Sequence, residues 1–183
     1  MKFSNLFKKM SYSPPERAVY AQIVAKARQK WLYLKAGVPD NVTGRFDMIT
    51  LHSFLLLEHI GGKTKTEADF AQALFDEIFL DMDHSLREMG VGDLSVGKKV
   101  RKMSELFYGA CNGYRKVFES AATDLNKELG DALKRNATGA EVKPEQLDLL
   151  VAYVLKTKAQ IDTIPVENIL AGQFDWPDLD MEA

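Results

Sequence analysis

The sequence has a single cysteine, no long hydrophobic run and no stretch that alternates like a strand. One cysteine excludes an intrachain disulfide and a zinc site built on several thiolates. The most apolar stretch, 48–60, is interrupted by two histidines, a serine and a glutamate, and it is too short to span a bilayer. Residues 1–10 contain lysines but neither an apolar core nor a small-residue cleavage site, so we expect no secretory signal.

No charge of one sign is in large excess over the whole chain. Lysine and arginine number 24 against 26 aspartate and glutamate, which gives a net charge of −2 and argues against a dedicated DNA-binding protein. The charge is uneven, because residues 1–40 hold eight basic and two acidic residues, whereas residues 141–183 hold three and nine. Either the two ends attract each other across one fold, or they form two faces with different partners.

Helical periodicity runs through the chain. With 183 residues, 46% of them hydrophobic, the chain is long enough for one domain with a sizeable core. We expect an all-α fold: one bundle-like domain of five to six helices, with a short amphipathic helix before it and an extended acidic tail after it. The three segments are 1–12, 13–164 and 165–183. The expected helices cover residues 13–36, 43–60, 66–89, 95–129 with a break at Gly109 or Gly113, and 144–161.

The usual signatures of catalysis fail in this sequence. Gly62-Lys63-Thr64 resembles the end of a phosphate loop, but the earlier glycine and the preceding strand are missing. Gly90 and Gly92 lie in a connector between two helices rather than in the strand–turn–helix of a dinucleotide motif. Cys111 has no histidine or acid beside it in sequence and is expected to be a buried, inert thiol; the alternative is a catalytic thiol to which the fold brings His52, His59 or His84. We therefore predict no catalytic residues and no cofactor.

A metal site is the enzymatic alternative that the residues leave open. Asp81 and His84 are spaced like half of a di-iron carboxylate motif, but such a site needs a second motif and two further carboxylates. Because this helix face lies away from the apolar stripe, a solvated acidic surface explains it better, and we predict no metal. A metal-dependent helical-bundle enzyme would use Glu77, Asp81, His84 and either His52 or His59.

Four cations gather in the first turns of the helix expected over 95–129. They are Lys98, Lys99, Arg101 and Lys102. Positive charge near a helix N-terminus opposes the helix dipole, at a cost of a few tenths to about 1 kcal/mol per residue. Since folding alone does not favour this arrangement, the basic cluster predicts a negatively charged partner: an acidic protein surface, lipid phosphates or RNA. A solvated face balanced by Asp93 and Glu105 is the alternative.

The densest sequence motifs lie between residues 44 and 114. The longest is Leu86-Arg87-Glu88-Met89-Gly90-Val91-Gly92-Asp93-Leu94, which is long enough to be specific. The others are Gly44-Arg45-Phe46-Asp47-Met48 with His52 and Phe54-Leu55, then Leu74-Phe75-Asp76, Asp81-Met82-Asp83, Val96-Gly97-Lys98 and Phe107-Tyr108-Gly109. Together these motifs resemble the ubiquinol–cytochrome c chaperone family.

The resemblance implies a helical assembly factor for the cytochrome bc1 complex, without catalysis. Mitochondrial members of that family bind newly made cytochrome b, act with a small partner protein and associate with the ribosome near its exit tunnel. We therefore expect an assembly chaperone for nascent cytochrome b, with the ribosome, a small partner protein and a membrane surface as further contacts. This chain lacks the N-terminal extension of the mitochondrial members, so their targeting, membrane attachment and partner do not carry over with the resemblance. Because the sequence shows no membrane span, no secretory signal and no Arg-rich presequence, we expect the protein in the bacterial cytoplasm or peripheral on the cytoplasmic face of the inner membrane.

A chaperone for a membrane protein needs an apolar groove that keeps hydrophobic segments of its client away from water. Methionines would make the floor of such a groove adaptable. Six apolar residues are candidates for it, with plain core packing as their alternative role: Met48, Leu51, Leu55, Phe79, Leu80 and Met82. A second set is expected to be structural, in part by holding the 90–93 connector with charge-assisted hydrogen bonds. These residues are Arg45, Asp83, Arg87, Gly90, Gly92, Asp93, Tyr108 and Gly109.

Two functions compete with a cytochrome b chaperone. A ribosome- or RNA-binding adaptor would work through the basic cluster at 98–102, and its binding would weaken strongly as the salt concentration rises. The metal-dependent enzyme described above is the second competitor, and analysis of the purified protein for metal would test it.

Overall fold

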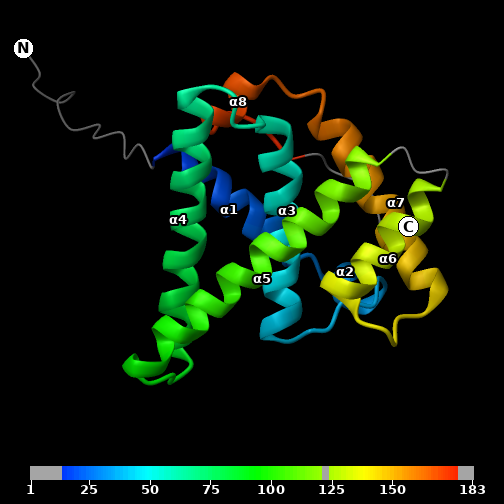
Figure 1. Cartoon of the computed structure of the whole chain (residues 1–183), viewed down its shortest axis with the longest axis horizontal. Coiled ribbons are helices and arrows are strands. Elements are labelled where there is room, and N and C mark those ends of the chain that lie inside the picture. The colour runs from blue at the N-terminus through cyan, green and yellow to red at the C-terminus, as the bar shows by residue number, and fades with distance from the viewer. Residues whose placement is uncertain (1–13, 121–123, 177–183) are drawn as a thin grey trace, which may run out of the picture.

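The computed structural model describes residues 14–120 and 124–176. Within these ranges every regular element is helical, which confirms the prediction of an all-α fold. Figure 1 shows α3 near the middle of the molecule, with α4 on one side and α6 and α7 on the other. The elements are α1 (Pro15–Ala27), α2 (Lys30–Leu34), α3 (Val42–Ile60), α4 (Lys65–Glu88), α5 (Asp93–Glu119), α6 (Leu125–Leu133), the π-helical turn η1 (Lys134–Thr138), α7 (Pro144–Ile161) and α8 (Val166–Leu170).

The central helix α3 has almost no polar face. Asn41 caps its N-terminus by accepting a hydrogen bond from the N–H of Gly44 (2.9 Å), and Gly61 ends the helix at φ 78°. Between these ends α3 packs on α1, α4, α5, α7 and η1. Its buried residues include Thr50, His52 and Ser53 beside the apolar ones. The apolar second half of the 43–60 segment is therefore covered on several sides by the fold itself.

The buried His52 has a hydrogen-bond partner on each ring nitrogen. Nδ1 donates to the carbonyl of Met48 on the preceding turn, and Nε2 accepts the hydroxyl of Tyr153 from α7, both at 2.7 Å. Burial lowers the pKa of His52 to about 4, so the ring is neutral at pH 7. This histidine thus joins α3 to α7 inside the core.

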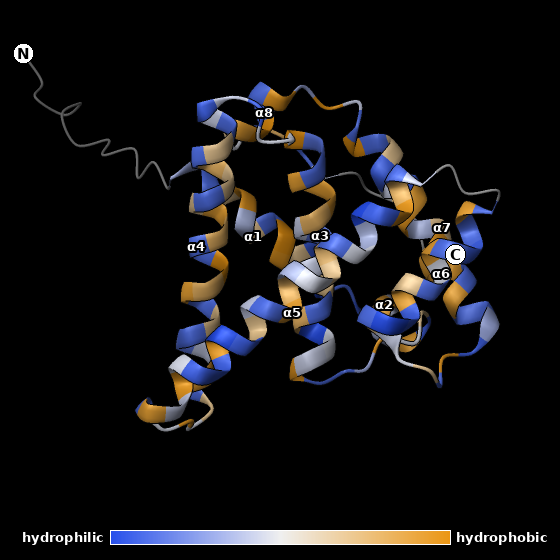
Figure 2. Cartoon of the chain, in the orientation of Figure 1, coloured by the Kyte–Doolittle hydropathy of each residue, from blue (hydrophilic) through white to orange (hydrophobic). Residues whose placement is uncertain are grey.

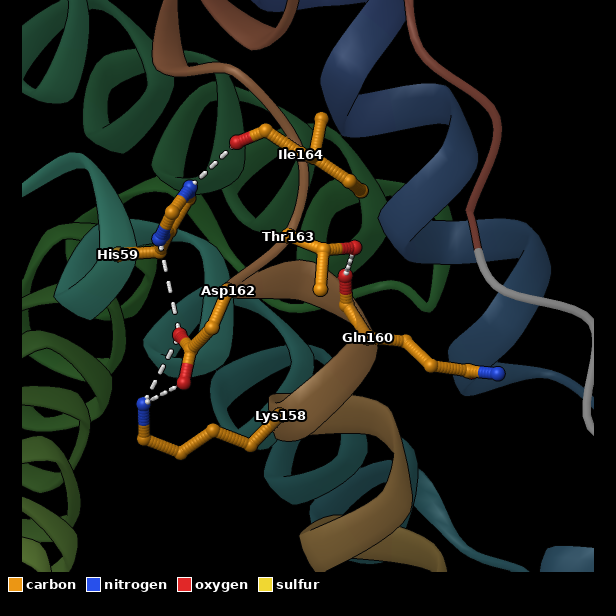
Figure 3. A network of polar contacts seen from close by, with 6 residues as sticks. All are labelled: His59, Lys158, Gln160, Asp162, Thr163 and Ile164. Atoms are coloured by element: carbon orange, nitrogen blue, oxygen red, sulfur yellow. Dashed lines mark hydrogen bonds and ion pairs between the residues drawn. The ribbon is translucent and has the colours of Figure 1, made fainter.

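A second histidine fastens the end of α3 to the segment after α7. Figure 3 shows His59 between the carbonyl of Ile164 and the carboxylate of Asp162. Its Nε2 donates to Ile164 at 2.7 Å, and its Nδ1 lies 3.6 Å from Asp162, which also receives Lys158 at 2.8 Å. The contact fixes the path by which the chain leaves α7 and returns across α3.

Helices α4 and α5 form a helical hairpin in which α4 lies on one side of α3, and α5 diverges from α4 to cross α3 and reach α6 (Figure 1). Thr64 and Glu67 make a reciprocal capping box at the start of α4. At its end the N–H of Val91 donates to Leu86 and the N–H of Gly90 donates to Arg87, with Gly90 at φ 81°. This is a Schellman motif, which satisfies the last carbonyls of the helix. Both helices carry bands of hydrophobic and hydrophilic residues, as Figure 2 shows.

The prediction of one helix over 13–36 is wrong, because the chain bends between α1 and α2. Gln29 is in an extended conformation and accepts a hydrogen bond from the indole N–H of Trp31 (3.1 Å). The bend lets both Trp31 and Leu32 become buried, which a straight helix with one apolar stripe would not allow. The predicted cap at residue 13 and the predicted amphipathic segment 1–12 lie outside the described residues.

The prediction of one helix over 95–129 is also wrong, and so is its proposed break at a glycine. Gly109 and Gly113 stay inside α5, since the buried Phe107 and Tyr114 pack on both sides and outweigh the cost of about 1 kcal/mol for a helical glycine. The helix ends at Glu119 instead, and Asp124 caps a new helix by accepting the N–H of Lys127. The polar connector expected over 135–143 begins as the π-helical turn η1.

The described part of the 165–183 segment packs on the fold, whereas an extended tail was expected. It contains α8, and Ile169, Phe174 and Trp176 are all buried. The Gln22 side chain of α1 donates to the carbonyl of Phe174 (2.8 Å) and accepts the N–H of Trp176 (3.1 Å). These widely spaced apolar residues make the acidic segment part of the core. Among the described helices none combines the length and the hydropathy needed to cross a bilayer.

Candidate functional site

The six residues predicted to line an apolar groove are almost all core residues. Met48, Leu51 and Leu55 of α3 are at most 1% exposed, and Phe79 and Met82 of α4 are 8% exposed. They line no open groove in this structure, because the helices of the fold cover them. The exception is Leu80, which is 47% exposed and lines a hollow between α1 and α4 together with Tyr20 and His84.

A cluster of aromatic rings joins α4 to α5. Phe75 lies 4.5 Å from Phe79 and 5.1 Å from Tyr108, measured between ring centroids, and it stacks on Tyr108 with an interplanar angle of 28°. Phe107 meets Phe75 and Phe79 edge-on, each at 5.8 Å. Three of these rings are covered to a large degree, but Tyr108 is 58% exposed. The cluster therefore presents one aromatic side chain to solvent on a rigid aromatic floor.

A hollow of about 520 Å³ opens beside this tyrosine, between α3 and α5. We call it the Tyr108 hollow. One edge is polar, because Arg115 donates to the carboxylate of Glu58 at 2.9 Å. Its floor includes Cys111, a thiol whose pKa burial raises to about 12, which makes it unreactive. The residues that line it are Phe54, Leu57, Phe107, Tyr108, Gly109, Cys111, Asn112 and Arg115.

The residues expected to be structural fall in three places. Arg45 is exposed and pairs with Asp40 at 2.8 Å, whereas Gly44 beside it is locked, because a Cβ there would lie 2.0 Å from the carbonyl oxygen of Pro39. Tyr108 and Gly109 line the Tyr108 hollow. The remaining residues surround the turn between α4 and α5: Asp83, Arg87, Gly90, Gly92 and Asp93.

At that turn Arg87 is held between two carboxylates. Its guanidinium donates to Asp83, one turn earlier on α4, and to Asp93, the first residue of α5. The guanidinium lowers the pKa of Asp83. Gly92 precedes α5 as its N-cap residue in an extended conformation. The three charged side chains thus link the two ends of the connector.

The basic cluster is exposed along the first half of α5, and its charges are only partly compensated. Arg101 lies 3.3 Å from Glu105, and Lys102 lies 3.7 Å from the same carboxylate. Asp93, the other acid expected to balance the cluster, is engaged by Arg87. Within the described ranges Lys98 and Lys99 have no ion-pair partner.

The residues of the metal hypothesis come together only in part, because Glu77, Asp81 and His84 line the hollow between α1 and α4 whereas His52 and His59 lie on α3. Asp81 accepts the hydroxyl of Tyr20 at 2.6 Å, and Glu77 lies 3.6 Å from Arg17. His84 is exposed, while His52 and His59 are held by the hydrogen bonds described above. Among the described residues no three His, Cys, Asp or Glu side chains are grouped so that they could hold a metal ion.

The sequence analysis missed a half-buried carboxylate on α3. Burial raises the pKa of Asp47 to about 7. Asp47 lines a hollow of about 310 Å³ with Leu106, Arg135 and other residues of α5 and η1. An acid between Phe46 and Met48 in an apolar helix is the signal that could have found it.

Comparison with known proteins decides the family. Residues 34–176, most of the chain, match the sequence model of a family described as ubiquinol-cytochrome C chaperone. The chain belongs to the ubiquinol–cytochrome c chaperone family. This family consists of chaperones and assembly factors and is not a catalytic one, in agreement with the failed search for an active site. The crystal structure of a Cbp3 homologue from Brucella abortus has the same fold, with a TM-score of 0.73, 35% identity, and coverage of 90% of this chain and 89% of that one.

Curated relatives of this chaperone family extend the comparison to vertebrates. Ubiquinol-cytochrome-c reductase complex assembly factor 1 of Xenopus laevis is 26% identical over 160 residues, which cover 86% of this chain and 78% of the relative. The proteins of the same name from Mus musculus and Homo sapiens are 27% and 26% identical. This chain spans about half the length of those two relatives.

Proposed function

We propose that this protein holds newly made cytochrome b through the Tyr108 hollow and releases it into the growing ubiquinol–cytochrome c reductase complex. The observation that carries the proposal is an exposed tyrosine on a rigid aromatic floor beside an apolar hollow, in a chain of the ubiquinol–cytochrome c chaperone family. Relatives are named as assembly factors of that complex.

The chemistry of the client supports this location. Cytochrome b is a membrane protein, so its spanning segments expose apolar surface until they are inserted, and covering that surface is favourable. The volume of the hollow, about 520 Å³, lies within the range of small-molecule pockets, about 300–1,000 Å³. It would therefore accommodate a few side chains of one client segment rather than a whole helix. Tyrosine suits such a site because its ring adds contact area and loses little conformational entropy on binding.

Leu80 provides a matched control for this site. It is an exposed apolar residue of α4 that lines a different hollow, between α1 and α4. A photo-crosslinking amino acid is placed at Tyr108 or at Leu80, and each variant is expressed in its own host during synthesis of cytochrome b. We expect crosslinks to cytochrome b from position 108 and few from position 80. Crosslinks to cytochrome b from position 80 and none from position 108 would contradict the proposed site and would indicate that the client binds at the hollow between α1 and α4.

The function itself is tested independently of the site. Deletion of the gene in its host should lower the b-type haem signal in difference spectra of the membranes, with the subunits of the bc1 complex depleted. Unchanged spectra would show that the protein is not needed for assembly of the complex. If the wild-type gene restores the b-type haem signal in the deletion strain and the Tyr108→Ser variant does not, assembly of the complex depends on the Tyr108 hollow.

A further inference from the structure

The turn between α4 and α5 extends beyond the rest of the helical domain. Figure 1 shows it at the lower left, away from α3, α6 and α7, and Figure 2 shows hydrophobic colour at this end of the hairpin. Leu94 there is 95% exposed, and Met89 is 52% exposed. We call Met89, Leu94, Lys98 and Lys99 the hairpin tip. It combines two features that folding does not use: exposed aliphatic side chains and unpaired cations.

The residues next to the hairpin tip are held in place by burial, by the end of α4 and by ion pairs. Leu86 and Val96 are 6% and 0% exposed, although neither belongs to the main hydrophobic core. The Schellman motif closes α4, and Arg87 ties Asp83 to Asp93 across the connector. The fold thus buries Leu86 and Val96 on the two sides of the connector but leaves Leu94 exposed to solvent. The exposure of Leu94 is therefore a feature of a defined turn.

Among the charges near the hairpin tip that lack an ion-pair partner in the described part of the chain, cations outnumber acids. Asp83 and Asp93 are bonded to Arg87, and Glu105 is shared by Arg101 and Lys102. In the part of the chain that the structure describes, Glu88 is the nearby acid and Lys98 and Lys99 are the nearby cations that lack an ion-pair partner. Lys98 and Lys99 are the sixth and seventh residues of α5, so they lie beyond the first turn and the helix dipole hardly affects them. Their two unpaired charges raise the local positive potential, which attracts an external anion.

We propose that the hairpin tip docks on the surface of a membrane that contains anionic lipids. Leu94 and Lys98 are four residues apart on α5 and so lie on one face of the helix. When that face meets a bilayer, Leu94 and Met89 enter the boundary between head groups and acyl chains. Lys98 and Lys99 then remain at the level of the phosphates, which is the arrangement of interfacial anchors.

The exposed apolar residues favour lipid over RNA as the anionic partner. Proteins that bind single-stranded RNA combine cations with aromatic rings on which bases stack. The exposed apolar residues of the hairpin tip are a leucine and a methionine, which gain nothing from bases but gain free energy in an acyl boundary. This proposal does not rest on the client site, because the Tyr108 hollow lies elsewhere on α5.

The test uses the full chain and vesicles of phosphatidylcholine alone or mixed equally with phosphatidylglycerol. Each lysine near an anionic surface contributes about fivefold to partitioning, so Lys98→Ala with Lys99→Ala should weaken binding to mixed vesicles by about 25-fold at low salt. Leu94→Ser should weaken it as well, by about tenfold. Leu34→Ser is the matched control, because Leu34 is 77% exposed but belongs to α2. Residues 1–13 are the same in all variants, so any contribution they make to vesicle binding cancels when the variants are compared.

A second measurement reports insertion directly. The emission of Leu94→Trp should shift to the blue on mixed vesicles and be quenched by brominated lipids, whereas Trp31 and Trp176 are already buried and should not respond. Equal binding of the wild type, the lysine variant and Leu94→Ser would overturn the proposal. So would co-sedimentation with ribosomes that needs both lysines and is indifferent to Leu94→Ser, since that pattern assigns the cations to RNA.

Discussion

Tyr108 of α5 stacks on Phe75 of α4, with ring centroids 5.1 Å apart and the planes at 28°. Phe75 in turn contacts the buried Phe79 and Phe107. One face of Tyr108 is thus held by the protein, and more than half of the side chain is left to solvent. The phenylalanine rings of the cluster therefore maintain the fold, and the exposed part of Tyr108 is available to a partner.

Two substitutions in this cluster should therefore behave differently. Tyr108→Ala should lower the free energy of unfolding by about 1–2 kcal/mol, because it removes the ring contacts with Phe75 and Phe107 at the surface. Phe79→Ala should lower it by about 3–5 kcal/mol, because it leaves a cavity in the core. Urea unfolding of both variants measures this. A Phe79 variant as stable as the wild type would show that this ring does not belong to the core and would restore it as a groove residue.

A pair of glycine variants tests the packing beneath the family motifs. Gly44→Ala should destabilise the protein severely, because the added Cβ would lie 2.0 Å from the backbone oxygen of Pro39. Gly109→Ala adds a methyl group into open space within α5 and should stabilise the protein by about 0.5–1 kcal/mol through helix propensity. Thermal unfolding of the two variants side by side gives the comparison. Loss of client binding in the stable Gly109→Ala variant would mark the rim of the hollow as a contact surface.

The raised pKa of Asp47 makes stability depend on pH. In the unfolded chain Asp47 titrates near 3.8, and in the folded protein it titrates at about 7. The folded state therefore binds this proton more tightly, and the contribution of Asp47 to stability is lost as the pH rises from 4 through 7. Asparagine does not titrate, so the Asp47→Asn variant does not lose stability in this way. The difference in free energy of unfolding between the variant and the wild type should therefore grow by up to about 4 kcal/mol from pH 4 to pH 7 and then level off.

The measurement is urea unfolding of the wild type and Asp47→Asn at several pH values. Other titrating groups, including His52 with its lowered pKa, are shared and cancel in the difference between the two proteins. Asp40→Asn is a suitable control, because Asp40 is exposed and pairs with Arg45 at the surface. A difference that does not change with pH would show that Asp47 is solvated in the folded protein.

The C-terminal segment should prove essential for stability. Trp176 is 6% exposed and lies with its ring 5.4 Å from that of His52, so Trp176→Ala should cost about 3–5 kcal/mol. Glu167→Ala changes an exposed acid of α8 and should cost less than about 0.5 kcal/mol. Thermal unfolding and limited proteolysis compare the two. If Trp176→Ala unfolds at the wild-type temperature, the segment is a tail and not part of the core.

Prediction from the sequence succeeded where one helix carries its own signal. The helix over 144–161 begins at a proline and ends where its apolar period ends, and both limits agree with α7. It failed at the boundaries of α1, α2, α5 and α6, because the bend before Trp31 and the new cap at Asp124 depend on what the neighbouring helices bury. Local periodicity contains no information about those neighbours.

The same division applies to the candidate site. The helical class, the family motifs and the unusual cations at Lys98 and Lys99 were predictable from composition, spacing and charge alone. Which apolar residues are core and which are surface depends instead on how the helices pack against one another. Phe79 and Leu80 are neighbours in sequence, yet Phe79 packs against Phe75 and Phe107 whereas Leu80 faces α1, since successive residues of a helix point about 100° apart.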